Sequence, residues 1–284
     1  MPLPPTTRLL STPWFPTPGS VEPGVQLFAI GDVHGRAGAL EAALDAIADS
    51  PRAAATRRLV FLGDLIDRGP RSLLCLEMAR QGEHHAQVDE CFVLPGNHEI
   101  MMAEALLEPG YMMIPWVEAG GKAVLLETGI DPEAEPDAIA QALQPLLPEG
   151  WAQDVLASEG HHRSGDVLCV HAGVHPHIPL DGFLAQAPNA PGLMEHHWAW
   201  IREPFLSWTR GWDPAGKTVV VHGHTPAVAG WIGSEQDMAA LVPLDRRRVC
   251  LDAAAAARAQ VAWVEWVGHK ARVRCVQHNR GDVF

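Results

Sequence analysis

The sequence predicts an α/β protein with parallel strands in its first half. Three stretches there repeat the same order of apolar run, polar loop and helical pattern, and they begin near residues 25, 59 and 91. Strands joined through helices are parallel, with right-handed crossovers, so their loops share one edge of the sheet. The last two apolar runs of the chain meet at Gly268, as in a hairpin. The C-terminal half therefore adds a mixed or antiparallel sheet to the first.

Length and composition predict one large soluble domain. The chain has 284 residues, 47% of them hydrophobic, which is enough for a substantial core. Its formal charge of -13, from 21 basic and 34 acidic residues, argues against binding to nucleic acid or to an anionic membrane. The five cysteines are scattered without a Cys-x-x-Cys pair, which favours a reduced, cytoplasmic setting. No apolar run reaches the roughly 18 residues that a membrane span needs.

The first 24 residues are expected to form an extended arm. They contain seven prolines, which resist regular structure. Trp14 and Phe15 are the residues that would hold this arm against the body of the protein. The main domain is then expected to cover residues 25–284.

The elements of the first half follow from short apolar runs and from helical periodicity. Runs of four to six apolar residues that stop at a turn are typical of buried strands. The predicted strands are Val25–Ile30, Leu59–Leu62 and Cys91–Leu94, and the helical patterns are Ala39–Ala48, a stretch from Arg71, and one that continues to Leu107.

Residues 108–165 interrupt this pattern and are interpreted as an inserted, cap-like region. Met112–Val117 is apolar and predicts a buried helical piece. The stretch from Asp131 to Pro148 is rich in proline and acidic residues, and predicts a surface excursion over the site.

Apolar runs resume after this region. The run at Val167 closes at His171, and the run at Thr218 closes at His222-Gly223-His224. The predicted strands are Val167–Val170, Thr218–Val221, Arg248–Leu251, Gln260–Val267 and Ala271–Gln277.

Several strands end in Asp, His or Asn, the ligand types of a hard-to-borderline divalent metal site. Six ligands without a thiolate are too many for one tetrahedral zinc, but they suit two metals that share a bridging carboxylate. Asp64 is the natural bridge, because it is the lone acid at the end of the middle strand. The candidate ligands are Asp32, His34, Asp64, Asn97, His171 and His224.

These motifs together resemble a known family. In chain order they are Gly31-Asp32-Val33-His34-Gly35, Gly63-Asp64-Leu65-Ile66-Asp67-Arg68-Gly69, Gly96-Asn97-His98-Glu99, His171-Ala172-Gly173 and Gly223-His224-Thr225-Pro226. They are similar to the signature blocks of the phosphoprotein phosphatase family of calcineurin-like metallophosphoesterases, and look closest to the compact phage and bacterial serine/threonine phosphatases. The resemblance covers roughly residues 25–255. It implies an α/β sandwich of two mixed β-sheets flanked by helices.

The resemblance also implies how the ligands divide. Asp32, His34 and Asp64 would hold one metal, and Asp64 would hold the other together with Asn97, His171 and His224. Mn²⁺ is the expected ion, with Fe, Zn²⁺ and Mg²⁺ also compatible with this ligand set. A hydroxide between the two metals would attack phosphorus in line.

Other residues are expected to act on the substrate. Arg68 and Arg202 would bind its phosphate group, with Asn97 beside them. His98 is the candidate general acid for the leaving alkoxide, and Asp67 would orient and charge it. Each has a plainer interpretation: Arg68 could pair with Asp67, and Arg202 with Glu203, as ordinary surface ion pairs.

One motif departs from the family pattern. Where related phosphatases continue into an Asp-Thr-Gly-Ala strand, this chain has Asp252-Ala253-Ala254-Ala255. The missing glycine raises the question of how the backbone turns there.

The expected function is the hydrolysis of phosphomonoesters, namely phosphoserine or phosphothreonine in proteins or a small phosphoester. The alternative enzyme is a symmetrical dinucleoside tetraphosphate hydrolase. Those relatives often lack an acid at the position of Asp67 and have Asp at the position of Glu99, so both residues favour the phosphatase. A third hypothesis, from another class, is a catalytically inactive phosphopeptide-binding regulator.

Overall fold

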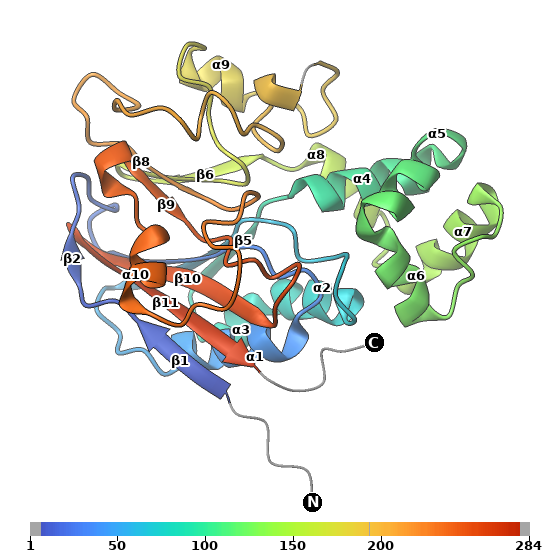
Figure 1. Ribbon diagram of the computed structural model, residues 1–284, viewed down its shortest axis with the longest axis horizontal. Coiled ribbons are helices and arrows are strands. Elements are labelled where there is room, and N and C mark those ends of the chain that lie inside the picture. Colours follow the sequence, from blue (N-terminus) through green and yellow to red (C-terminus); the bar gives the residue numbers. More distant parts are fainter. Residues whose placement is uncertain (1–6, 193, 279–284) are drawn as a thin grey trace, which may run out of the picture.

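The computed structural model describes residues 7–192 and 194–278. Two β-sheets pack face to face, and helices cover the outer side of the larger sheet (Figure 1). This is the α/β sandwich with two mixed sheets that the motifs predict.

The larger sheet combines both ends of the chain. Its strand order is β1-β11-β10-β3-β4-β5, with β2 also paired to β11. Strands β3, β4 and β5 are parallel, as predicted, and β5 lies at the edge of the sheet. Strands β10 and β11 form an antiparallel hairpin beside β3. The bounds are β1 Thr7–Ser11, β2 Phe15–Pro16, β3 Val25–Ile30, β4 Thr56–Phe61, β5 Glu90–Val93, β10 Gln260–Val267 and β11 Lys270–His278.

The smaller sheet has the order β6-β7-β8-β9. Strands β7, β8 and β9 are parallel, and β6 runs antiparallel at the edge. The bounds are β6 His161–Ser164, β7 Val167–Val170, β8 Val219–His222 and β9 Arg248–Cys250. The C-terminal hairpin thus belongs to the first sheet and not to this one.

Alternation along the strands explains the sandwich. In β3, Leu27 and Ala29 face the smaller sheet, whereas Phe28 and Ile30 face the helices. All six residues of β3 are buried, as expected of a central strand that is covered on both faces. The two cores fix the register of the strands, because a slip by one residue would exchange their faces.

The expected arm contains two strands in its described part. Residues Thr7–Ser11 contain no proline and pair with β11, and Pro16 lies in an edge strand, where its missing N–H costs little. Trp14 lies under the Arg272 guanidinium, 4.8 Å from it. Sheet pairing therefore overrides the effect of the prolines between residues 7 and 16, while the prolines at positions 2, 4 and 5 lie outside the described residues.

Helices fill the connections. Three helices begin just after the strand-end loops, as predicted. They are α1 Ala37–Ala48, α2 Ser72–Arg80 and α4 Asn97–Leu107. The other helices and helical turns are α3 Gly82–Ala86, α9 Leu180–Leu184, α10 Glu235–Ala240, and 3-10 turns at Met194–His196 and Leu244–Arg246.

Residues 108–165 are mainly helical, and their helices α5, α6 and α7 extend to one side of the sandwich with α4 (Figure 1), whereas the last residues form β6 of the smaller sheet. The predicted buried piece is half right: Met113 and Trp116 are buried, but Ile114 is 63% exposed. The stretch predicted as a surface excursion contains α7, which buries Ile139 and Leu143. The bounds are α5 Pro109–Trp116, a π-helical turn Val117–Gly121, α6 Lys122–Thr128, α7 Pro136–Leu143, a 3-10 turn Gln144–Leu146 and α8 Trp151–Ala157.

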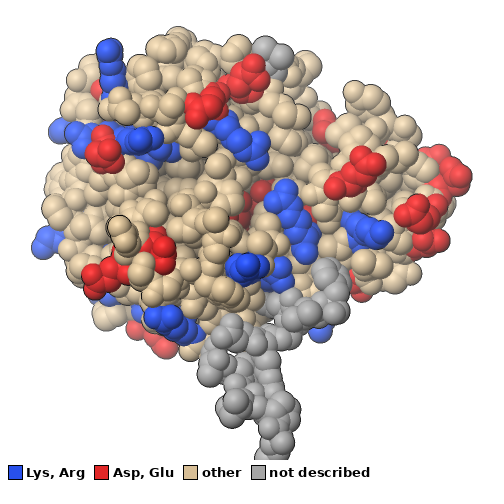
Figure 2. Space-filling view, in the orientation of Figure 1, with Lys and Arg blue, Asp and Glu red and all other residues tan. Residues whose placement is uncertain are grey.

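Charges are dispersed on the surface. Figure 2 shows Lys and Arg in small separate groups among acidic side chains, without a continuous basic stripe on the face that it draws. None of the helices in the described ranges combines the length and the apolar character that a membrane crossing requires.

Candidate active site

The site lies where parallel strands of both sheets end. Asp32 and His34 follow β3, Asp64 follows β4, and Asn97 opens α4 just after β5. From the smaller sheet, His171 follows β7 and His224 follows β8. These six predicted ligands are all buried, with exposed fractions of 8% or less.

Asp64 stands between two groups of potential ligands. Its Oδ2 lies 3.6 Å from His34 Nε2, and its Oδ1 lies 3.5 Å from His171 Nε2. One group that could hold a metal ion contains Asp64 with His34 and His98, and the other contains Asp64 with His171 and His224. This is the geometry expected of a carboxylate that bridges two metals.

The histidine tautomers fit a cation. His34 Nδ1 and His171 Nδ1 lie 2.9 Å and 2.8 Å from the carbonyl oxygens of Ile66 and Leu62, so each Nδ1 carries the hydrogen. The Nε2 lone pairs then face the Asp64 carboxylate. Burial lowers the pKa of His171 to about 3 and that of His34 well below its usual value, so both rings are neutral. Lone pairs that face a carboxylate repel it unless a cation lies between them, and the residues therefore fit a divalent metal.

Asn97 joins the second group. Its Oδ1 lies 3.0 Å from His171 Nε2 and 2.8 Å from His224 Nδ1. Two imidazoles and an amide oxygen thus converge beside Asp64, as the motifs predict. Burial lowers the pKa of His224 far below its usual range, which keeps the ring neutral and leaves one of its nitrogens available to a metal.

Asp32, which is predicted to share a metal with His34 and Asp64, belongs to neither ligand group among the described residues and contacts His224 instead. Both of its carboxylate oxygens accept the backbone N–H of His224, at 3.0 Å and 3.1 Å. Burial raises its pKa well above the usual value, and the nearby charges of Asp252 and Asp64 add to this. A buried group of like-charged carboxylates is stabilised by a bound cation.

The backbone is strained at this cluster. Of the eight non-glycine residues with positive φ in the described ranges, five carry predicted site side chains. Such conformations each cost of order 1–3 kcal/mol and concentrate at functional sites. The five are His34, Asp64, Asp67, Arg68 and His224.

His98 and Asp67, which are predicted to act together, are in contact. His98 Nδ1 lies 2.6 Å from Asp67 Oδ2, and both side chains are buried. Because Nδ1 is occupied by Asp67, the other ring nitrogen of His98 faces the metal group. Burial is the main cause that raises the pKa of Asp67, and an indole N–H from Trp116 opposes it.

The two predicted phosphate-binding arginines, Arg68 and Arg202, are exposed and act on different ligands. Burial is the main cause that lowers the pKa of each ligand histidine and of His98. The charge of Arg68 adds to this effect at His34 and His98, and the charge of Arg202 adds to it at His171 and His224. Arg68 Nε contacts the carbonyl oxygen of Ala119 at 3.4 Å. Both guanidinium groups are therefore near the centre and free to meet an anion from solvent.

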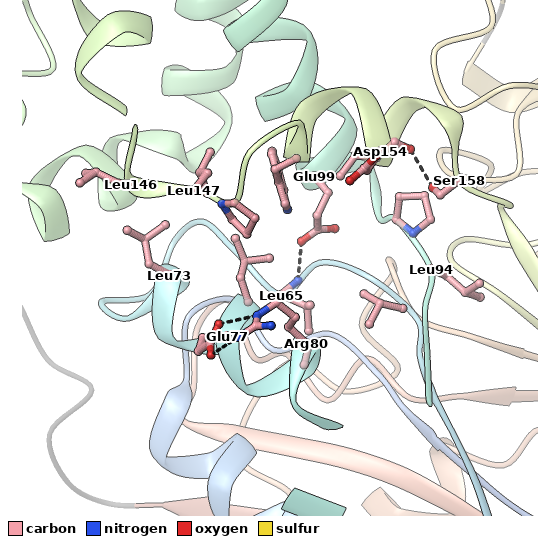
Figure 3. A pocket seen from close by; sticks show the side chains of 17 residues that line it. Leu65, Leu73, Glu77, Arg80, Leu94, Glu99, Leu146, Leu147, Asp154 and Ser158 are labelled. Carbon is pink, nitrogen blue, oxygen red and sulfur yellow. Dashed lines mark hydrogen bonds and ion pairs between the residues drawn. The ribbon is translucent and has the colours of Figure 1, made fainter. Parts of the chain in front are cut away.

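Glu99 has a role that the motifs do not reveal. Its carboxylate accepts backbone N–H groups from Asp64, Leu65 and Gly96 at 2.7–2.8 Å, and a fourth from Ile66 at 3.3 Å. It thus joins the turn after β4 to the start of α4. Figure 3 shows Glu99 and Leu65 in the wall of a cavity, which has a volume of about 400 Å³ and a mainly apolar lining. Its four acceptor contacts could be found only from the folded geometry.

Replacing Glu99 by Gln should loosen this junction. The amide presents N–H groups to two of the four donors, so buried hydrogen bonds are lost at a cost of about 2–4 kcal/mol. Misplaced ligands should also weaken Mn²⁺ binding by about 10–100-fold. Denaturant unfolding and metal titration by calorimetry measure both effects. Retention of wild-type stability and metal affinity would contradict this role.

The departure at Ala254 has a structural answer. Ala254 adopts φ +62°, and its N–H donates to Asp252 Oδ1 at 2.8 Å, so the backbone turns as a glycine there would allow. Burial raises the pKa of the Asp252 carboxyl to about 6. The chain keeps the turn and accepts the strain of a left-handed alanine.

Ala254→Gly should therefore stabilise the protein. Removing the Cβ relieves about 1–2 kcal/mol of left-handed strain, offset by the entropy that glycine gains when unfolded. We expect a net gain of about 0.5–1 kcal/mol in the free energy of unfolding, with activity unchanged. Ala255→Gly is the matched control and should destabilise. A loss of stability in Ala254→Gly would show that this turn is not strained.

The family follows from a match across most of the chain. Residues 25–251 match the model of the calcineurin-like phosphoesterases. The chain belongs to this family. Members of this phosphoesterase family use divalent metals, in agreement with the ligand groups around Asp64. The match covers all six predicted ligands.

Curated relatives carry a common name. A protein of Chromohalobacter salexigens named symmetrical bis(5'-nucleosyl)-tetraphosphatase is 36% identical over 105 residues, which are 35% of this phosphoesterase and 36% of the relative. One of Actinobacillus pleuropneumoniae with the same name is 25% identical over 192 residues, 66% of this chain and 61% of the relative. The phosphoesterase therefore covers less than two thirds of either relative.

A solved structure has the same fold. It is provisionally described as a diadenosine tetraphosphatase, with a TM-score of 0.52 and 17% identity over 94% of this chain and 99% of its own. At this identity the likeness shows the fold alone.

Proposed function

We propose that the protein hydrolyses dinucleoside tetraphosphates symmetrically, to two nucleoside diphosphates. The observation that carries this proposal is the pair of exposed arginines at one buried ligand cluster: Arg68 acts electrostatically on His34 and His98, and Arg202 on His171 and His224. A polyphosphate chain offers charged oxygens on several phosphorus atoms, so two separate guanidinium groups can each bind a phosphate of the same substrate. The name shared by the curated relatives supports the same substrate class.

Two divalent ions, which we propose to be Mn²⁺, would be held by this ligand set. Asp64 is the residue common to both ligand groups. When bound, such ions activate water and neutralise phosphoryl oxygens. The six ligands are Asp32, His34, Asp64, Asn97, His171 and His224.

The chain's own groups would complete the reaction. Arg68 and Arg202 orient the phosphates, and their positive charge favours the charged transition state. His98, held by Asp67 at 2.6 Å, would give its proton to the departing oxygen. Burial of His98 and Asp67 excludes bulk water and strengthens the interaction between them.

A second candidate is a phosphoserine or phosphothreonine phosphatase. The pair of His98 and Asp67 favours it, because an alkoxide leaving group needs a proton far more than a nucleoside diphosphate does. Glu99 also favours the phosphatase, because dinucleoside tetraphosphate hydrolases have Asp at this position.

Product analysis with diadenosine tetraphosphate tests the main proposal. The Mn²⁺-loaded protein should yield ADP as the single nucleotide product, as resolved by anion-exchange chromatography. A mixture of ATP and AMP would contradict symmetrical cleavage. Release of phosphate from a phosphothreonine peptide without cleavage of the tetraphosphate would establish the second candidate. Absence of turnover with Mn²⁺, Fe²⁺, Zn²⁺ and Mg²⁺ would leave the binding-only regulator.

A further inference from the structure

The segment Val117–Gly121 and the preceding Trp116 contact the turn after β4 that contains Asp67 and Arg68. Trp116 is fully buried, and its indole Nε1 donates to both carboxylate oxygens of Asp67, at 3.2 Å and 3.1 Å. Asp67 thus receives hydrogen bonds from two side chains, Trp116 and His98. The motifs assign no role to Trp116.

The same segment holds the neighbouring arginine. The backbone N–H of Arg68 donates to the carbonyl oxygen of Gly120 at 3.2 Å, and Arg68 Nε contacts the carbonyl oxygen of Ala119 at 3.4 Å. Asp67 and Arg68 both have positive φ, of 68° and 65°. Two consecutive left-handed residues need outside contacts to hold them, and this segment with Trp116 supplies contacts to each.

Glycines make the close approach possible. Gly120 has φ +140°, and a Cβ there would lie 2.8 Å from Arg68 Cγ. A Cβ on Gly121 would lie 2.3 Å from the Trp116 ring. Gly120, at φ +140° and ψ -7°, interrupts the helical backbone between α5 and α6, so this segment is a kink at a glycine rather than a continuous π-helix. The backbone here is shaped around one indole and one arginine.

We propose that Trp116 and the kinked segment Val117–Gly121 are a positioning element, which aligns Asp67 for the proton donor His98 and fixes the direction of Arg68. The indole N–H favours the charged carboxylate of Asp67, which in turn orients the His98 ring. The carbonyl oxygen of Ala119 contacts Arg68 Nε, and the carbonyl oxygen of Gly120 accepts the backbone N–H of Arg68. This inference rests on the proposed phosphoester hydrolysis, but not on the choice between its two substrates.

Trp116→Phe tests the first half. It should lower kcat for a phosphothreonine peptide by about 10–100-fold and leave p-nitrophenyl phosphate within about threefold, because nitrophenolate departs without a proton. Trp266→Phe is the matched control: Trp266 is also fully buried, but its Nε1 donates to Gly268 O on the C-terminal hairpin. Equal losses for both esters would contradict the proposal.

A double-mutant cycle separates positioning from packing. If Trp116 acts through Asp67, adding Trp116→Phe to Asp67→Asn should change kcat by less than about twofold. The same loss in both backgrounds would overturn the proposal. Should the Phe variant fold poorly, replacement of Trp116 by 3-benzothienylalanine keeps the ring shape and removes only the N–H, and the same cycle applies.

Gly120→Ala tests the second half without turnover. The strained backbone and the contact with Arg68 should weaken the binding of inorganic phosphate to the Mn²⁺-loaded protein by about tenfold in calorimetry. Gly110→Ala, where nothing lies within 4 Å of an added Cβ, is the control and should bind as wild type does. Unchanged phosphate affinity in Gly120→Ala would overturn the arginine half. If the wild-type protein cleaves no ester, the proposed function fails, whereas this binding test still decides the inference.

Discussion

Asp64→Asn is expected to reduce phosphoester hydrolysis by about 10³-fold or more, which corresponds to about 4 kcal/mol of transition-state stabilisation. Asp64 is the residue shared by both ligand groups, so its neutral amide weakens both metal positions at once. Steady-state rates with p-nitrophenyl phosphate over a Mn²⁺ titration measure the loss. Asp89→Asn, at an exposed carboxylate paired with Arg52, is the matched control and should keep full activity.

The same variant should fold well. Asn tolerates the positive φ of 54° at this position, and its side-chain oxygen can still accept the N–H of His98. Burial raises the pKa of Asp64, so removing its charge should not destabilise the metal-free protein. At a metal concentration 100 times Kd, metal binding raises the free energy of unfolding of the wild type by about 2.7 kcal/mol. The increase should be much smaller for the variant. A full Mn²⁺-dependent rise in melting temperature for Asp64→Asn would exclude Asp64 as the bridge.

His98→Asn should act according to the leaving group. Loss of the proton donor should slow a phosphothreonine peptide by about 10²–10⁴-fold, because the alkoxide then departs unprotonated. p-Nitrophenyl phosphate and diadenosine tetraphosphate have weakly basic leaving groups and should lose far less. kcat for the three substrates, measured with wild type and variant at saturating Mn²⁺, gives the comparison.

Equal losses for all three substrates would instead place His98 among the metal ligands. His98 lies with His34 and Asp64 in one group of potential ligands, so it is close enough to bind the same ion. A drop in Mn²⁺ affinity of His98→Asn, seen by calorimetry, would accompany it.

Local sequence patterns predict the parallel strands well. Val25–Ile30 and Val167–Val170 are observed with the predicted bounds, because a short apolar run that stops at a turn is enough to define a buried strand. The sheet to which a strand belongs is a long-range property. The pairing of β10 with β3 joins residues more than 230 positions apart, and no local pattern specifies it.

The site was predictable where residues follow strand ends. Asp64, His171 and Asn97 meet because parallel strands deliver their carboxyl ends to one edge. The contacts of Trp116 and Glu99 are not apparent from the sequence, since each side chain contacts a turn more than 30 positions away. An indole in an apolar helix and a glutamate in a first helical turn both have ordinary structural explanations from sequence.

A competition assay tests the central claim most directly. Diadenosine tetraphosphate and a phosphothreonine peptide are mixed at equal concentration with the Mn²⁺-loaded protein, and both are followed by chromatography. The proposed function predicts faster consumption of the tetraphosphate, with ADP as its nucleotide product and with a higher kcat/KM. Preferential dephosphorylation of the peptide would contradict it and identify a protein phosphatase.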